Sequence, residues 1–334
     1  MRTWHWPAVL WLATFLTPFC SVRAQRGPPH IGYVYPAGGQ RGTTFQVTVG
    51  GQHLTNTKLA SFSGKGIQAT LLGEIDLTFM KEGGKLRDRL RALMGATRDE
   101  AKEKEVAEIL KKLYQIYIME ARRRIPAISE SIQLEITLAP DAEPGPRELR
   151  IQTPRGESNR LAFCVGTLPE FYEPEPVLPP EPKDARRASG AGPIRQTLDI
   201  TLPAVVNGQI IAREPNQPSW EADRFTPGDA DRYRFEARKG QQLVIAASAR
   251  ELIPYLPDAV PGWFQATLTL YDAKGKELAY DDDYRFHPDP VLFYKVPEDG
   301  QYVVEIKDAI YRGRPDFVYR IAIGELPYVT SIFP

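Results

Sequence analysis

The sequence predicts an all-β protein made of two β-sandwich domains joined by a proline-rich linker. Many short segments alternate apolar and polar residues, which is the pattern of half-buried strands. The 334 residues include 30 prolines and 26 glycines, and these turn residues separate the alternating segments. A chain of this length is long enough for two domains that each bury a core.

Residues 28–167 are predicted to form the first sandwich. Thr44 to Val49 alternates cleanly and ends at Gly50-Gly51, a pair typical of a tight turn. Further strands are expected at 131–138, 147–153 and 161–165. Pro144-Gly145 favours a turn between the first two of them.

Residues 81–124 interrupt this pattern and predict an inserted helical hairpin. Apolar residues recur there at helical spacing, and Gly95 divides them into two runs. Thr97 and Glu100 make a capping box for the second helix. The insertion either covers a sheet edge or serves as a partner-binding arm, and the sequence leaves both interpretations open.

The second half of the chain begins with a predicted linker. Residues 168–193 are rich in proline with interspersed glutamate, a composition that favours an extended, semi-rigid segment. Residues 194–326 then return to strand-like alternation, as around Tyr233 and Phe235, with turn motifs such as Lys239-Gly240. Short strands of this spacing predict a second sandwich, of the jelly-roll type.

Both ends of the chain carry further predictions. Residues 1–24 are typical of a secretory signal peptide, because Arg2 precedes an apolar stretch and Val22-Arg23-Ala24 places small residues at the expected cleavage positions. That stretch is short for a membrane span, so a retained anchor is the weaker alternative. We expect a secreted, periplasmic or cell-surface protein with no transmembrane span after cleavage. Residues 327–334 repeat the proline and aromatic pattern of residues 29–36, which predicts the start of a further repeat of the first domain.

The second domain resembles the bacterial pre-peptidase C-terminal domain over nearly all of residues 194–325. The matching segments are Asn207-Gly208-Gln209-Ile210, Asp229 to Phe235, Lys239-Gly240-Gln241, Leu270-Tyr271-Asp272 and Pro297 to Tyr302. That family is a jelly-roll-like β-sandwich appended to secreted peptidases and other large extracellular proteins. The resemblance implies a noncatalytic role in secretion, substrate contact or stability.

The first domain is similar to immunoglobulin-like IPT/TIG domains. The similarity lies in Tyr35-Pro36, Gly42, Phe45-Gln46-Val47, Gly50 to Leu54 and Pro144 to Arg147, and the helical insertion departs from the family pattern. The two modules together resemble large secreted proteins of planctomycete-type bacteria. No segment resembles a peptidase domain, so the resemblance implies no peptidase activity.

The sequence holds few candidates for catalysis. Beyond the leader the histidines are His30, His53 and His287, and their spacing is not that of a zinc site. No Gly-x-Ser-x-Gly or phosphate-binding motif occurs. Cys164 would be the only cysteine after cleavage, which excludes an internal disulfide, and its apolar strand favours a buried thiol over a nucleophile. We therefore expect no enzyme activity; a hydrolase with an unrecognised site is the competing interpretation.

Two clusters are candidate sites. Asp281, Asp283 and Asp289 offer the oxygen ligands that calcium prefers, and a solvated acidic turn is the alternative. A ligand-binding strip is predicted at Trp263, Tyr280, Tyr284 and Phe286, since exposed aromatic rings stack on polymers, although such residues also fill cores. No cofactor other than calcium is expected.

These observations predict a noncatalytic multi-domain protein, secreted or in the cell envelope, with a structural, adhesive or ligand-presenting role. The alternative is a module that targets protein or polysaccharide for a secreted peptidase or glycosidase whose catalytic part lies elsewhere. An extracellular protein or a polysaccharide is the expected partner. The formal net charge of zero provides no basic field for nucleic acid.

Overall fold

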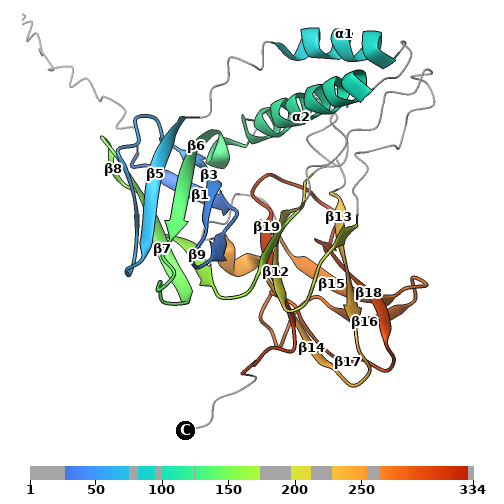
Figure 1. Cartoon of the computed structure of the whole chain (residues 1–334). Coiled ribbons are helices and arrows are strands. Elements are labelled where there is room, and N and C mark those ends of the chain that lie inside the picture. Colours follow the sequence, from blue (N-terminus) through green and yellow to red (C-terminus); the bar gives the residue numbers. More distant parts are fainter. Residues whose placement is uncertain are drawn as a thin grey trace, which may run out of the picture.

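The computed structural model describes residues 27–74, 82–94, 100–123, 125–173, 197–211, 228–253 and 264–329. Within these residues, strands form four sheets that stack in two sandwiches, and the two α-helices lie in one insertion (Figure 1). The predicted all-β fold is therefore confirmed. The predicted signal peptide at 1–24 and residues 174–193 of the predicted linker lie outside the described residues.

The first sandwich consists of two antiparallel-rich sheets. One sheet has the order β1 (His30–Tyr35), β3 (Thr44–Gln52), β6 (Glu130–Leu138), β5 (Ile67–Glu74). The other has the order β2 (Gly38–Gln40), β9 (Leu161–Gly166), β7 (Gly145–Thr153), β4 (Leu59–Phe62), and β8 (Gly156–Glu157) pairs with β7. Alternate residues of β6, such as Ile132, Leu134 and Ile136, are fully buried, as the period of two requires.

The insertion contains α1 (Gly83–Met94) and α2 (Glu100–Arg123). The helices pack through Leu93, Ile109 and Leu113, and Arg89 pairs with Glu105 at 2.7 Å. In Figure 1 the hairpin stands beyond the strand ends, and α2 returns to the first sandwich at the 3₁₀ turn η2 (Pro126–Ile128). This position favours the arm interpretation over a cover along a sheet edge.

The second sandwich is also built from two sheets. The first, called here the β12 sheet, has the order β10 (Glu170–Tyr172), β12 (Ala204–Gln209), β19 (Val318–Gly324), β14 (Gln242–Ser248), β17 (Val291–Lys295). The second, the β13 sheet, has the order β11 (Leu198–Asp199), β13 (Ala230–Ala237), β18 (Gly300–Asp308), β15 (Ala266–Asp272), β16 (Glu277–Asp281). Their inner faces share one core around Tyr233, Ile245 and Ile306.

The predicted linker differs from the structure at its start. Residues 170–172 form β10, which pairs in parallel with β12 and extends the second sandwich. The proline-rich composition suggested a spacer, but Phe171 packs against the core of the second sandwich, and Glu170 accepts a hydrogen bond from Asn207 of β12. The chain therefore enters the second sandwich before the proline-rich stretch.

The two sandwiches are in direct contact. Leu252, from the 3₁₀ turn η3 (Arg250–Leu252), and Val318 of β19 belong to the hydrophobic core of the first sandwich. Beside them Arg320 and Glu170 form a buried ion pair at 2.7 Å, and Asn207 bonds to both partners. This network joins β10, β12 and β19 and so holds the β10 segment on the second sandwich.

Both sandwiches place a tyrosine ring against a glycine of the neighbouring strand. Gly50 lies opposite Tyr33, and a Cβ atom on Gly50 would lie 2.1 Å from the Tyr33 ring. Gly208 lies opposite Tyr319, and a Cβ atom there would lie 2.1 Å from the Tyr319 hydroxyl. These glycines are needed for space, so that a buried aromatic ring can lie across the strand.

Candidate functional site

The predicted ligand-binding strip is divided by the fold. Tyr280 lies on β16, whereas Tyr284 and Phe286 lie in the connection between β16 and β17. Trp263 lies outside the described residues. Tyr280 is 50% exposed and Phe286 is 100% exposed, so neither belongs to the core.

A strained turn holds Phe286 in solvent. Tyr284 and His287 close it by two backbone hydrogen bonds of 2.9 Å, and Arg285 and Phe286 between them have φ values of 51° and 67°. Such turns usually contain Asn and Gly, because the left-handed conformation costs other residues about 1–2 kcal/mol each. Both central residues of this turn have the unfavourable left-handed conformation, and the second of them exposes an aromatic ring. Strain of this kind points to a functional site.

Tyr284 forms the centre of an aromatic cluster with Phe293 of β17 and Tyr328. The ring centroids lie 5.4 to 5.9 Å apart, with tilted or edge-to-face geometry. Phe293 is 47% exposed and Tyr328 is 39% exposed, so the three rings fix one another yet still face solvent. We call Tyr284, Phe286, Phe293 and Tyr328 the aromatic shelf. The Arg285 guanidinium lies 5.3 Å from the Tyr284 ring and is a cation at its border.

Sequence reasoning missed two members of the shelf. Phe293 follows the buried Leu292, and alternation along the predicted strand at 291–296 was a signal that Phe293 faces outward. Tyr328 had been interpreted as part of a further repeat at 327–334. Residues 327–329 form no strand, and 330–334 lie outside the described residues, so the repeat stays a prediction.

The predicted calcium ligands do not meet at one point. Asp289 is buried and accepts backbone hydrogen bonds from Arg250 (2.6 Å) and Glu251 (3.1 Å), one on each carboxylate oxygen. Asp281 accepts a bond of 2.7 Å from the Val291 backbone, and Asp283 is exposed. Burial raises the pKa of the Asp281 carboxyl, and Asp282 and Asp283 raise it further against the effect of the Val291 bond. Asp289 turns inward to bind η3, and among the described residues the three carboxylates do not form a group with converging oxygens. Calcium binding by Asp281, Asp283 and Asp289 stays a prediction.

Replacing Asp289 by alanine tests this structural role. We expect the free energy of unfolding to fall by about 1–3 kcal/mol, because two partly buried backbone N–H groups lose their acceptor. The loss should be equal in calcium and in chelator, measured by thermal melting. Asp283→Ala is the matched exposed control and should change the midpoint little. A loss that appears in calcium and vanishes in chelator would restore Asp289 as a metal ligand.

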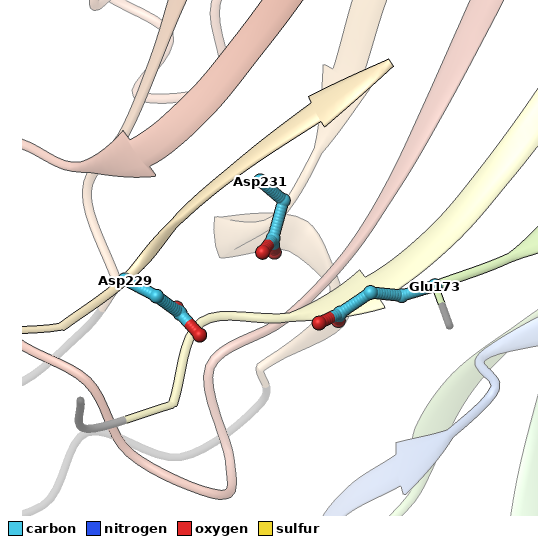
Figure 2. Close-up of side chains that lie close together, drawn as sticks. All are labelled: Glu173, Asp229 and Asp231. Atoms are coloured by element: carbon cyan, nitrogen blue, oxygen red, sulfur yellow. The ribbon is translucent and has the colours of Figure 1, made fainter. Parts of the chain in front are cut away.

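A different set of carboxylates converges in the second sandwich. Glu173, Asp229 and Asp231 each place one oxygen within 4.8 Å of the others (Figure 2). Asp229 and Asp231 are buried; Asp229 accepts a hydrogen bond from the Ile211 backbone, and Asp231 accepts one from the Tyr319 hydroxyl. Among the described residues these three are the ones that could hold a hard cation such as calcium, which prefers oxygen ligands.

The sequence carried part of the signal for this cluster. Asp229 and Asp231 stand two residues apart at the start of a strand, so they share a face. Glu173 was missed because it was placed in the linker. Its position next to them depends on the pairing of β10 with β12.

The remaining nucleophile candidate is Cys164 on β9. Burial raises the pKa of its thiol, Glu170 and Glu251 raise it further, and Arg320 and Arg147 act in the opposite direction. A protonated thiol is a weak nucleophile. Cys164 is partly buried, and its structural role stays a prediction.

Comparison with known proteins gives partial matches. No family model matches the chain. An 80-residue stretch is 35% identical to a probable subtilase-type serine protease from Deinococcus radiodurans. The match covers 24% of this chain and 10% of the protease, so the chain spans about a tenth of that relative.

Solved structures give distant likenesses. The pre-peptidase C-terminal domain of a Bacillus anthracis collagenase is 12% identical, with 38% of this chain and 94% of that domain covered and a TM-score of 0.27. SGBP-B from a xyloglucan utilization locus of Bacteroides uniformis is 10% identical, with 89% and 72% covered and a TM-score of 0.21. At these TM-scores neither likeness decides a function. The resemblance of the first domain to IPT/TIG domains stays a prediction.

No helix in the described part of the chain combines the length and the apolar character needed to span a bilayer.

Proposed function

We propose that this chain is a noncatalytic binding module of a secreted or cell-envelope protein, and that the aromatic shelf is its contact surface for a protein partner. The observation that carries the proposal is the fully exposed Phe286, held in a strained turn that begins at Tyr284, one of three mutually packed rings. An apolar ring exposed to water is unfavourable in free energy, and burial of the ring against a partner would be favourable.

The layout of the shelf favours a protein over a small molecule. Its centre is apolar, formed by the rings of Tyr284, Phe293 and Tyr328. Charged groups lie at the border, with Arg285 on one ring and the acidic residues 281–283 directly before the turn. An apolar centre with a polar rim is the usual anatomy of a protein interface, and Tyr and Phe are enriched at its centre.

Peptide selection tests the shelf directly. The full chain would be immobilised and panned with a random peptide phage library, and enriched peptides would be measured by titration. We expect them to bind the double variant Tyr284→Ala/Phe293→Ala at least about tenfold more weakly, because central aromatic contacts dominate such interfaces. Leu59→Ala is the matched control, since Leu59 is 51% exposed on the first sandwich. Equal affinity for the double variant and the parent protein contradicts the proposal.

A second candidate function is targeting of a protein substrate for a secreted peptidase. It is supported by the 80-residue match to a subtilase-type protease, of which the chain covers only a small part. Retention on insoluble elastin and keratin separates the candidates: retention that the double variant loses favours targeting, whereas peptide binding without retention favours an adhesive role. Both candidate functions assume that the chain is noncatalytic, and hydrolysis of casein by the purified full chain would contradict that assumption.

A further inference from the structure

The outer face of the β13 sheet carries a row of polar and aromatic side chains across four strands. Tyr280 of β16 lies opposite Thr269 of β15, Thr269 lies opposite Glu305 of β18, and Glu305 lies opposite Arg232 of β13. Their strand neighbours Leu268, Ile306 and Tyr233 fill the core, so the row faces away from it. With strands about 4.8 Å apart, the row is about 14 Å long.

A buried carboxylate organises the centre of this row. Glu305 is 3% exposed although it lies on the outer face. Arg232 binds one of its oxygens at 2.6 to 2.7 Å, and Lys307 lies 3.4 Å from the other. The Arg232 side chain is nevertheless 56% exposed. Glu305 therefore fixes a guanidinium whose outer edge stays in solvent, where it can donate hydrogen bonds to a ligand without first being ordered.

The loop after β18 places one aromatic side chain, Tyr311, beside Lys307. Asp308, with no exposed surface, accepts hydrogen bonds from the backbone of Ile310 and Arg312 and from the Arg312 guanidinium. This clamp holds Tyr311 at a φ of 60°, with 60% of the residue exposed. The Lys307 ammonium lies 5.4 Å from the Tyr311 ring.

Tyr280 and Tyr311 belong to the same surface, because Lys307 lies beside the Tyr311 ring and pairs with Thr267, two residues from the Thr269 that lies opposite Tyr280. Burial raises the pKa of the Tyr280 phenol, and nearby Asp282, Tyr311 and Asp281 raise it further. The sequence suggested Tyr280 as a ligand residue together with Tyr284. In the structure Tyr280 instead lies near Tyr311, in the loop about thirty residues further along the chain. Tyr280 belongs to the β13 sheet, whereas Phe293 belongs to the β12 sheet.

We propose that this face, formed by Arg232, Tyr280, Glu305, Lys307 and Tyr311, binds a neutral polysaccharide chain. The exposed tyrosine rings offer apolar faces for the C–H surface of a sugar ring. Beside them Arg232, held in place by the buried Glu305, and the Lys307 ammonium supply donors for hydroxyl groups. Arg232, Tyr280 and Tyr311 are exposed on different strands and loops of one sheet surface, a spread that suits a polymer.

The pattern of charge and polarity excludes other polymers. A protein interface has an apolar centre and a polar rim, whereas this face has a charged centre and aromatic residues at one end. Its cations Arg232, Arg234 and Lys307 are balanced by the carboxylates of Glu305, Asp199 and Asp282. Such balance provides no attraction for nucleic acid or for an acidic polysaccharide.

Affinity electrophoresis of the full chain tests this proposal. Native gels would contain hydroxyethyl cellulose, xyloglucan or laminarin, with polygalacturonate as the acidic polymer. We expect retardation by at least one neutral polymer, and a dissociation constant about tenfold or more weaker for Tyr280→Ala/Tyr311→Ala. Arg232→Ala, which leaves both rings in place, should also weaken binding, and circular dichroism would verify that each variant is folded.

The shelf variant Tyr284→Ala/Phe293→Ala is the matched control and should be retarded like the parent protein, because Tyr284 lies in the connection after β16 and Phe293 lies on β17 of the other sheet. Loss of peptide binding and loss of polysaccharide binding are thus separable. The proposal is overturned if no neutral polymer retards the parent protein, if the Tyr280/Tyr311 variant is retarded equally, or if polygalacturonate binds more strongly than the neutral polymers.

Discussion

Arg320→Ala is expected to lower the free energy of unfolding by about 3–5 kcal/mol, because it leaves the Glu170 carboxylate buried without its cation. The two side chains are 6% and 3% exposed, and Arg320 binds both Glu170 oxygens, at 2.7 and 3.1 Å. Asn207 completes the network with bonds to each partner of 2.6 and 2.7 Å. Urea unfolding followed by circular dichroism measures the loss.

Two controls distinguish the cost of a buried unpaired carboxylate from the cost of removing an arginine charge in general. The double variant Arg320→Met/Glu170→Gln removes both charges, and we expect it to be more stable than Arg320→Ala, since no buried charge stays uncompensated. Arg150→Ala removes an ion pair with Glu157 at 2.9 Å whose side chains are 37% and 56% exposed, and should cost about 0–1 kcal/mol. If Arg320→Ala cost no more than Arg150→Ala, the network would not hold the β10 segment in place.

Gly208→Ala is expected to cost about 3 kcal/mol or more, since the new methyl group would occupy the position of the Tyr319 hydroxyl. Tyr319 is 1% exposed, and its hydroxyl donates to Asp231 at 2.7 Å and bonds to the Tyr233 hydroxyl. Burial raises the pKa of Tyr319 far above its usual value, and Asp231 and Tyr233 add to the effect, so the phenol stays protonated. Moving the ring therefore breaks buried hydrogen bonds and the packing of the core together.

The matched control is Gly300→Ala in β18, where no atom lies within 4 Å of the added Cβ. That variant should be neutral or slightly more stable. Thermal melting compares the two. Equal midpoints for Gly208→Ala and the parent protein would show that the ring moves without cost, which contradicts the need for glycine at this position.

Local patterns predicted most of the architecture. Strand alternation around Tyr233 and Phe235 depends only on a period of two, so the inward and outward residues could be assigned before any partner strand was known. The helical spacing of the insertion is local in the same way, and the structure has α1 and α2 there. The β10 segment could not be predicted in this way, because three residues are too few to show an alternation of apolar and polar side chains. Their strand conformation comes from pairing with β12.

The candidate sites were predicted less well. Tyr284 and Phe286 were identified as ligand residues, but their partners Phe293 and Tyr328 come from two other segments. Asp281, Asp283 and Asp289 were grouped because they are close in the sequence, whereas Asp289 turns inward to η3. The converging carboxylates join Glu173 to Asp229 and Asp231 across more than fifty residues.

The sequence alone determined the fold class, the alternating faces of the strands, the inserted helices and the scarcity of catalytic motifs. Each of these depends only on the order of neighbouring residues. Which side chains meet was decided only by the tertiary structure, since strand pairing, the contact between the sandwiches and the left-handed turns at Phe286 and Tyr311 bring distant segments together. Binding surfaces consist of side chains from segments that are far apart in the sequence, and no periodicity along the chain encodes such contacts.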